Sequence, residues 1–423
     1  MSKSEPDGKP FVIPKRLVWE AYRRVAANKG AAGVDGQSIA DFEADLKNNL
    51  YRIWNRMSSG TYFPPPVLMV EIPKPDGSGR RVLGVPTVAD RVAQTVAAMA
   101  MQARTEEIFQ DDSYGYRPGR SALDAVATCR QRCWKNDWVI DLDVAAFFDS
   151  VDHDLMVKAV EANITHQQRW ILLYVKRWLK VPLQQPDGSL CQRERGTPQG
   201  SAISPLLANL FMHYAFDSFL TRQHPGVEFE RYADDAVVHC QTVHQARQVR
   251  AAIAARLESV GLRLHPTKTR IVYCKDSRRR GSYEHTSFTF LGYTFRPREA
   301  VDKAGRRFTA FTPAVSPRAL KAMSRQVRHW RIHRRTGHDL NALATKLNPI
   351  VAGWMHYYGR FYRSAMYPLL RRINAYLMRW ARRKHKRLRS YKRAAAWWAG
   401  VINRDPSLFT HWTWMTAYAG RIR

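Results

Sequence analysis

The chain has 423 residues, of which 45% are apolar, and this ordinary apolar share excludes a wholly disordered protein. There are 68 Lys and Arg against 36 Asp and Glu, so the formal net charge is +32 and the pI is about 10.4. Such an excess of positive charge predicts a polyanionic partner, and nucleic acid is the leading candidate. The length predicts roughly two or three domains.

The sequence has no feature of a membrane-spanning or secreted protein. No apolar run approaches the ~18 residues that a transmembrane helix needs. Residues 1–10 are polar and partly acidic and lack the apolar core of a signal peptide. A membrane surface could also attract positive charge, but five scattered cysteines fit a reducing compartment. We therefore expect a cytoplasmic protein without a membrane partner.

Two segments carry carboxylates in apolar surroundings. Residues 138–149 open with a predicted buried strand that ends near Asp143, and residues 229–240 predict a β-hairpin with Ala233, Asp234 and Asp235 at its tip. Close carboxylates repel one another and are costly to bury unless a cation holds them. A hard divalent ion such as Mg²⁺ suits oxygen ligands and phosphate chemistry. An isolated Asp pair is also common in hairpin turns that have no such role.

The composition changes near residues 300–316, with mixed helix and strand patterns before and a basic, helical pattern after. The motifs Arg296-Pro297-Arg298 and Thr312-Pro313 interrupt the pattern at this boundary. Residues 318–393 contain 21 Lys and Arg against one acid, Asp339, with aromatic residues interleaved throughout. Residues 275–285 are predicted to form an exposed loop.

The first basic segment predicts a helix with Ser316 as its N-cap and Pro317 at its first position. Helical spacing places one stripe of apolar residues opposite one stripe of basic residues. The apolar stripe holds Leu320, Met323, Val327 and Trp330, and the basic stripe holds Arg318, Lys321, Arg325 and Arg328. A second basic run, residues 379–389, contains Arg382, Arg383, Lys386 and Arg387. A solvated helix face normally mixes charges, so the absence of acids favours a polyphosphate-binding surface.

A series of ordered motifs resembles the reverse transcriptase/maturase proteins of bacterial group II introns. The Tyr-Ala-Asp-Asp sequence at residues 232–235 resembles the reverse transcriptase signature, and residues 143–149 resemble the first palm motif of these enzymes. The other matching blocks lie at residues 33–36, 60–66, 72–86, 114–121, 196–205, 264–270 and 290–293. The resemblance extends from about residue 19 to residue 414.

The resemblance implies an RNA-directed DNA polymerase in which Asp143, Asp234 and Asp235 hold two Mg²⁺ ions for in-line nucleotidyl transfer. It also implies a set of residues that contact the incoming dNTP. Lys74 and Arg81 match the fingers residues that bind the triphosphate, and Arg80 is a neighbouring candidate. Phe148 matches the position that excludes a ribose 2′-hydroxyl, although a Phe-Phe pair is more often part of a core. Gln199, with Gly200, matches the turn beneath the templating base, and Lys268 matches a lysine proposed to protonate pyrophosphate, although it is as readily a plain phosphate contact.

The fold implied by the resemblance is an α+β right-hand polymerase, with fingers and palm, followed by an all-helical basic thumb or maturase domain. The expected boundaries are an N-terminal extension at residues 1–70, fingers and palm at 71–310, and the thumb at 311–423. The expected partners are group II intron RNA, an RNA template with a DNA primer, dNTPs and target DNA. Splicing and retrohoming of the intron are the implied processes.

Two alternative functions stay open at this stage. Group II-like polymerases also serve in phage defence and in CRISPR spacer acquisition, and their motifs would be identical. An RNA-binding maturase with little polymerase activity is the other alternative, although Asp143, Asp234 and Asp235 are all present. After Tyr391 there is no Cys and one His, so we expect the compact class of intron proteins that lacks a Cys- and His-rich endonuclease domain.

Overall fold

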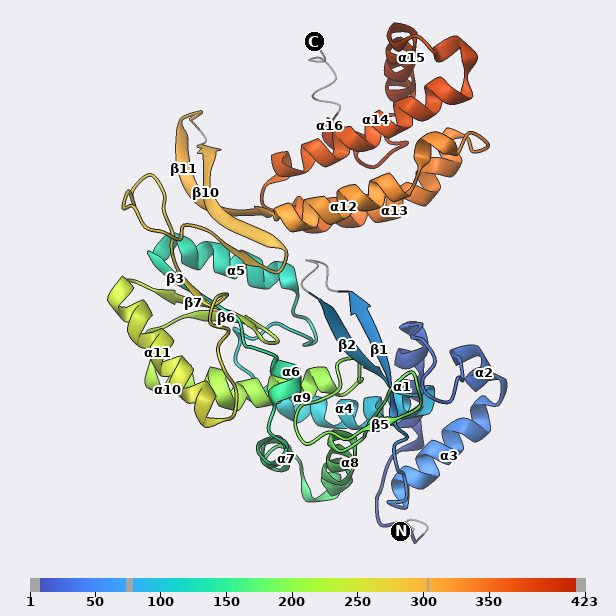
Figure 1. Cartoon of the computed structure of the whole chain (residues 1–423), viewed down its shortest axis with the longest axis vertical. Coiled ribbons are helices and arrows are strands. Elements are labelled where there is room, and N and C mark those ends of the chain that lie inside the picture. The colour runs from blue at the N-terminus through green and yellow to red at the C-terminus, as the bar shows by residue number, and fades with distance from the viewer. Residues whose placement is uncertain (1–7, 74–78, 303, 416–423) are drawn as a thin grey trace, which may run out of the picture. The chain divides into compact units, whose positions relative to one another are not determined.

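The computed structural model describes residues 8–73, 79–302 and 304–415 (Figure 1). The chain forms two compact units. The first comprises Met1–Arg132 and Trp138–Ile271, and the second comprises Cys133–Asp137 and Val272–Arg423. Both units contain helices and strands, so the expectation of a mixed α+β protein is confirmed.

The first unit begins with three helices, α1 (Lys15–Ala27), α2 (Ile39–Ala44) and α3 (Leu46–Ser58). Helix α1 is amphipathic and packs its buried face against the long helix α4 (Val88–Ile108). Helix α4 starts at Thr87, whose hydroxyl accepts a hydrogen bond from the backbone N–H of Asp90 at 3.1 Å. This cap satisfies one of the amide groups that every helix N-terminus leaves without an internal partner.

A four-stranded sheet with the order β2-β1-β4-β5 follows in the first unit. Its strands are β1 (Val67–Pro73), β2 (Arg80–Val85), β4 (Leu183–Gln184) and β5 (Leu190–Cys191). Strands β1 and β2 form an antiparallel hairpin, and β4 lies parallel to β1. Figure 1 shows this hairpin extending away from the helices at its base.

The second sheet of this unit has the order β6-β7-β3-β8 and carries the carboxylates. Its strands are β3 (Trp138–Leu142), β6 (Phe229–Tyr232), β7 (Asp235–Cys240) and β8 (Arg270–Tyr273), and the last two residues of β8 are assigned to the second unit. The predicted strand before Asp143 and the predicted hairpin with Asp234 at its tip are both confirmed. Strands β3 and β7 are almost entirely buried, and α11 (Val243–Ser259) packs against both.

Further helices surround the two sheets. They are α5 (Ala122–Lys135), α6 (Phe147–Ser150), α7 (His153–Glu161), α8 (Arg169–Leu179), α9 (Ser204–Met212) and α10 (Ser218–Gln223). Helix α7 packs against α8 and α9, and α9 continues through a π-helical turn at His213–Asp217 into α10. The turn places Asp217 in the buried interior of the unit, a position that matters for the site below.

The second unit contains a three-stranded sheet with the order β11-β10-β9. Its strands are β9 (Phe288–Phe290), β10 (Tyr293–Val301) and β11 (Arg307–Val315). Pro297 and Pro313 lie inside β10 and β11, opposite Phe311 and Phe295. The two prolines therefore do not interrupt the secondary structure, contrary to the expectation from the sequence. Residues 275–285 form no helix or strand, as expected for a loop.

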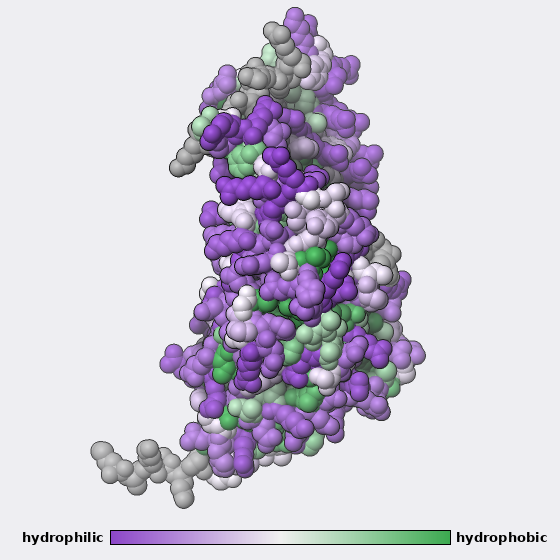
Figure 2. All heavy atoms as spheres, turned by 90° about the vertical axis from the view of Figure 1, so that its left-hand side faces the viewer, coloured by the Kyte–Doolittle hydropathy of each residue, from purple (hydrophilic) through white to green (hydrophobic). Residues whose placement is uncertain are grey.

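The rest of the second unit is helical, with α12 (Pro317–His329), α13 (Leu340–Tyr358), α14 (Tyr367–Lys384), α15 (Tyr391–Arg404) and α16 (Trp412–Met415). Helix α12 begins as predicted, because the Ser316 hydroxyl accepts a hydrogen bond from the Ala319 N–H at 3.2 Å. Its buried residues, Met323 and Val327, join a core with Trp380 and other apolar residues of α13–α16. Figure 2 shows hydrophilic side chains over most of the visible face of these helices. Among the described residues, no helix has both the length and the apolarity required to cross a membrane.

Candidate active site

Strand pairing brings the three predicted carboxylates to one end of the β6-β7-β3-β8 sheet. Leu142 pairs with Ala236, so Asp143 and Asp235 are the next residues on two adjacent antiparallel strands. Tyr232 pairs with Asp235, which leaves Ala233 and Asp234 as a two-residue turn. Ala233 takes the left-handed conformation, with φ of 58°, as tight hairpin turns require. The sequence thus places the two motifs together although 91 positions separate Asp143 from Asp234.

The local electrostatics disfavour three ionised carboxylates without a cation. Burial raises the pKa of Asp234, and the charge of Asp143 adds to the rise. Burial also raises the pKa of Asp235 to about 7, with further contributions from Asp234 and Asp143. A divalent cation would relieve this repulsion, and carboxylate oxygens are the ligands that Mg²⁺ prefers. The residues present therefore fit a magnesium site.

A fourth carboxylate, Asp141, belongs to the same cluster and was missed in the sequence. It lies on β3 two residues before Asp143, and alternate residues of a strand share a face. Burial raises the pKa of Asp141 to about 7, and the charges of Asp235 and Asp143 contribute. The signal that could have found it is the spacing of two acids, Asp141 and Asp143, at the end of a buried strand.

Lys268 comes to the cluster from the loop before β8. Its Nζ lies 3.4 Å from Oδ2 of Asp143, with 59% of the lysine side chain exposed. The neighbouring Thr269 hydroxyl donates to the Asp143 carbonyl at 3.1 Å, and the backbone N–H of His265 donates to the same carbonyl at 2.8 Å. These bonds fix the loop, so the lysine is held at the edge of the carboxylate cluster while its amine stays accessible.

The two hairpin arginines differ in their surroundings. Arg80 forms an exposed ion pair with Glu71 at 2.7 Å. The charge of Arg81 instead opposes the burial-driven rise in the pKa of Asp234 and Asp235, so Arg81 is the arginine oriented toward the site. Adjacent strand residues point to opposite faces, which explains the difference. Lys74 lies outside the described residues.

The turn at residues 196–200 contains Gln199 and is hydrogen-bonded to the backbone of Phe148. Phe147 is buried with 2% exposure, whereas Phe148 is only partly buried, so Phe147 is the core member of the pair. The Thr197 N–H donates to the Phe148 carbonyl at 2.7 Å, and the Gln199 carbonyl accepts from the Gly84 N–H at 2.7 Å. The turn therefore connects the segment after Asp143 to strand β2.

A buried ion pair supports the carboxylate hairpin, and its residues were also missed. Arg231 on β6 and Asp217 are both fully buried, and two N–H groups of Arg231 donate to the Asp217 carboxylate at 2.7 and 2.6 Å. Another N–H of Arg231 donates to the Ala233 carbonyl at 2.9 Å. Gly115 packs so closely on the hairpin that a Cβ there would lie 2.6 Å from the Ala233 nitrogen. These contacts hold the turn that carries Asp234.

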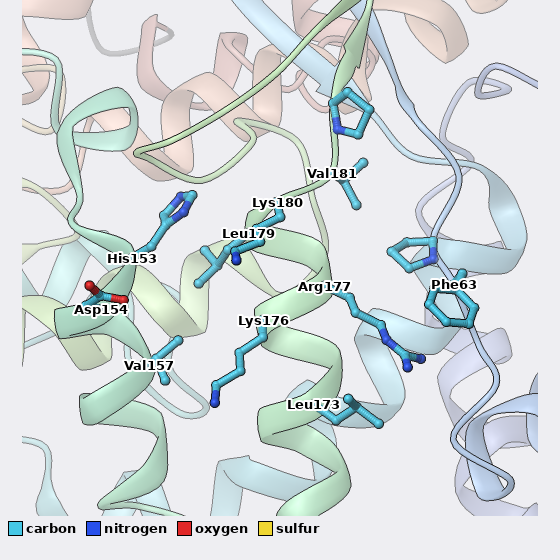
Figure 3. Close-up of a pocket in the computed structure, with 12 residues that line it drawn as sticks. Phe63, His153, Asp154, Val157, Leu173, Lys176, Arg177, Leu179, Lys180 and Val181 are labelled. Carbon is cyan, nitrogen blue, oxygen red and sulfur yellow. The ribbon is translucent and has the colours of Figure 1, made fainter.

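A cavity of about 600 Å³ lies elsewhere in the first unit, between α7, α8 and the segment before β1. Figure 3 shows Arg177 reaching from α8 toward Phe63, and its guanidinium carbon lies 3.9 Å from the centre of the Phe63 ring. None of the predicted site residues that the structure describes lines this cavity.

The predicted RNA-binding residues lie on the surface of the second unit. The basic stripe of α12 (Arg318, Lys321, Arg325 and Arg328) and the second set (Arg382, Arg383, Lys386 and Arg387) are all exposed. The guanidinium of Arg382 also donates twice to the Arg389 carbonyl, at 3.0 and 2.8 Å, so it has a structural role. Arg382, Arg383 and Arg389 line a recess of about 440 Å³ together with His333 and Arg379.

Comparison with known proteins identifies the family. Residues 72–295, more than half of the chain, match the family model for reverse transcriptase (RNA-dependent DNA polymerase). Residues 320–398 match the group II intron, maturase-specific domain.

Three relatives illustrate the range of similarity. Protein YkfC of Escherichia coli (strain K12) is 32% identical over 315 residues, which cover 65% of this chain and 78% of that protein. The group II intron-encoded protein LtrA of Lactococcus lactis subsp. cremoris is 28% identical over 229 residues, 54% of this chain and 37% of LtrA. The putative COX1/OXI3 intron 1 protein of Saccharomyces cerevisiae is 29% identical over 192 residues, 45% of this chain and 22% of that protein. The family resemblance is therefore confirmed: the chain belongs to the reverse transcriptases, RNA-directed DNA polymerases with a right-hand fold, and to the branch encoded by group II introns, whose maturase-specific domain it carries.

Proposed function

We propose that the chain copies RNA into DNA at the cluster of Asp143, Asp234 and Asp235, with two Mg²⁺ ions as cofactor. The observation that carries this proposal is the convergence of these carboxylates next to Lys268 and Arg81, together with the raised pKa values of Asp234 and Asp235, which a bound cation would lower. Bound Mg²⁺ would polarise the 3′-hydroxyl of the primer and offset the charge on the leaving pyrophosphate. The protein residues orient the substrates around that chemistry.

The incoming dNTP is bound, in this proposal, by residues from four segments. Arg81 and Lys74 contact the triphosphate, where fixed positive charge is most useful as negative charge develops. Lys268 donates a proton to the pyrophosphate, since its amine is exposed at the edge of the carboxylate cluster. Phe148 packs below the sugar and excludes a 2′-hydroxyl, and Gln199 lies beneath the templating base. Arg80, already paired with Glu71, contributes less.

We further propose that the second unit binds intron RNA through the exposed basic residues of α12 and of residues 382–387. The match to a maturase-specific domain at residues 320–398 supports this, as does the near absence of acids in the segment. In this scheme residues 1–70 form an N-terminal extension, 71–310 the fingers and palm, and 311–423 the thumb. Splicing assistance and retrohoming into target DNA follow as the biological roles.

One paired experiment tests the proposal. Replacing Asp234 with Asn should lower Mg²⁺-dependent extension of a DNA primer on an RNA template by several orders of magnitude, because the carboxylates hold the metal ions. Intron RNA binding should remain. Asp154→Asn, at an exposed site on α7, is the matched control and should keep full activity.

The same proteins should then be tested for splicing of an intron at near-physiological Mg²⁺. If the Asp234 variant extends primers normally, the polymerase assignment is wrong. A wild-type protein that extends primers but stimulates no intron splicing would favour a polymerase used in phage defence or spacer acquisition.

A further inference from the structure

A fully buried carboxylate, Asp90 on α4, has no role in the proposed chemistry. It has 0% exposure and forms no ion pair within the described residues. Instead it accepts three hydrogen bonds from neutral donors. Tyr62 Oη and Trp178 Nε1 donate to its Oδ1 at 2.9 and 2.8 Å, and Gln94 Nε2 donates to its Oδ2 at 2.9 Å. Burial raises the pKa of Asp90 to about 6, and the three donors act in the opposite direction.

Asp90 therefore fixes the orientation of the Gln94 amide. A carboxylate can only accept, so the NH₂ group of Gln94 must face Asp90 and its oxygen must face the other way. That oxygen accepts from the backbone N–H groups of Ala202 and Ile203 at 2.7 and 3.4 Å. Gln94 is itself buried with 1% exposure, so water does not compete for these bonds.

The two amides belong to the segment that follows the turn at Gln199 and Gly200. On its other side, this turn is bound to strand β2, since the Gln199 carbonyl accepts from the Gly84 N–H at 2.7 Å. Gly200 has φ of +115°, and a Cβ there would lie 2.7 Å from the Gly84 carbonyl oxygen. The segment at residues 199–203 is thus held by β2 on one side and by α4 on the other.

The partners of Asp90 come from two further segments. Tyr62 precedes β1, and Trp178 lies on α8, next to Arg177. The Arg177 guanidinium donates to the Gly60 carbonyl at 2.9 Å, and Figure 3 shows it directed toward Phe63, the neighbour of Tyr62. Asp90 consequently connects α4, α8 and the segment before β1, and through Gln94 it supports the residues that follow the turn of Gln199 and Gly200.

We propose that Asp90 and Gln94 are positioning residues that set the affinity of the polymerase for the incoming nucleotide. They act through the hydrogen bonds to Ala202 and Ile203, which hold the turn of Gln199 and Gly200 in place. The proposal rests on the polymerase function proposed above, in which this turn lies beneath the templating base. Neither Asp90 nor Gln94 contacts the reacting groups.

The hydrogen-bond pattern allows a test by exchange of donor and acceptor. In Asp90→Asn, the new NH₂ group faces the NH₂ group of Gln94. Gln94 must then rotate its amide, which turns its NH₂ group toward the backbone N–H groups of Ala202 and Ile203. Donors then face donors, and the two backbone N–H groups lose their acceptor. The double variant Asp90→Asn/Gln94→Glu restores the pattern, because the carboxylate introduced at position 94 would accept from both the amide introduced at position 90 and the two backbone N–H groups. The double exchange also conserves the buried charge.

Steady-state primer extension at pH 8 supplies the main measurement. We expect Asp90→Asn to raise KM for dNTP about tenfold, the effect of losing roughly one hydrogen bond, with kcat within about threefold of wild type. The double variant should return KM to near the wild-type value. Tyr62→Phe is the matched control, since it removes one donor to Asp90 without reversing Gln94, and it should lower Tm while leaving KM unchanged.

Three results would overturn the proposal: an unchanged KM in Asp90→Asn, no recovery in the double variant, or the same rise in KM for Tyr62→Phe. If Asp90→Asn does not fold, Gln94→Met removes the same acceptor and takes its place. If the wild-type protein extends no primer, the polymerase proposal fails instead. Hydrogen exchange at Ala202 and Ile203 in the same variants then tests the network separately, with faster exchange expected only in Asp90→Asn.

Discussion

The buried pair of Arg231 and Asp217 supports a quantitative prediction for Asp217→Asn. All five N–H groups of the Arg231 guanidinium have acceptors. Two donate to Asp217 at 2.7 and 2.6 Å, and the others donate to Asn209, Ala233 and Ser113 at 3.0, 2.9 and 2.8 Å. Asparagine keeps one acceptor, turns an NH₂ group toward the guanidinium and removes the neutralising charge.

The expected cost is about 3–5 kcal/mol of the free energy of unfolding, because both side chains have 0% exposure and the remaining cation is left without its partner. That is a large part of the ~5–15 kcal/mol that stabilises a typical domain. Glu71→Gln is the matched control. It breaks the pair with Arg80, whose side chains are 40% and 71% exposed, and should cost less than ~1 kcal/mol.

The assay is urea unfolding with hydrogen exchange read at the peptide covering residues 229–240, which reports the first unit specifically. We also expect slower primer extension, since the Ala233 carbonyl in the carboxylate turn depends on Arg231. A loss below ~1 kcal/mol, or one equal to that of Glu71→Gln, would show that the pair does not hold the hairpin.

Two further predictions concern substrate selection and RNA binding. Phe148→Ala should increase the incorporation of ribonucleotides relative to deoxynucleotides, which corresponds to a loss of about 1–3 kcal/mol in the free energy of discrimination. An unchanged ratio in competition kinetics would assign Phe148 to the core. Replacing Arg383, Lys386 and Arg387 with Gln should impair intron splicing more than primer extension and should flatten the dependence of RNA binding on salt. Arg382 is left in place because it holds the Arg389 carbonyl, and an equal loss in both assays would indicate a primer–template contact instead.

Local patterns predicted the elements that carry the site. The apolar run before Asp143 and the Asp pair at a hairpin tip each specify a short structure through nearby residues, and both structures are present. The N-cap at Ser316 is equally local, and the hydroxyl makes the expected bond. The prolines at 297 and 313 lie within paired strands, contrary to the prediction, because a strand pair tolerates a proline whose N–H is not needed by a neighbour.

Contacts between distant residues could not be predicted in the same way. Nothing near Asp217 in the sequence indicates that it pairs with Arg231 inside the core. Arg80 and Arg81 are adjacent in the sequence and lie on opposite faces of β2. The register of β1 against β2, which the sequence does not reveal, decides which of the two arginines is directed toward the carboxylates. Asp90 has the sequence context of an ordinary helix N-terminus, where an acid is normally exposed and interacts with the helix dipole.

Asp141 leads to the last prediction, because its buried negative charge is unfavourable unless a cation lies nearby. Its pKa is raised to about 7, first by burial and then by Asp235 and Asp143. An unfolded Asp ionises near pH 4, so the folded protein loses stability from this group as the pH rises from about 4 to 7. In EDTA, Asp141→Asn should therefore be more stable than wild type at pH 8 and no different at pH 4, as judged by urea unfolding. Saturating Mg²⁺ near Asp143 should reduce the advantage at pH 8, because the cation favours the ionised form of Asp141. By the same thermodynamic cycle, the variant must bind Mg²⁺ more weakly, by the same free energy that Mg²⁺ removes from its stability advantage. If the stability advantage of Asp141→Asn over wild type were independent of both pH and Mg²⁺, Asp141 would not belong to the cluster.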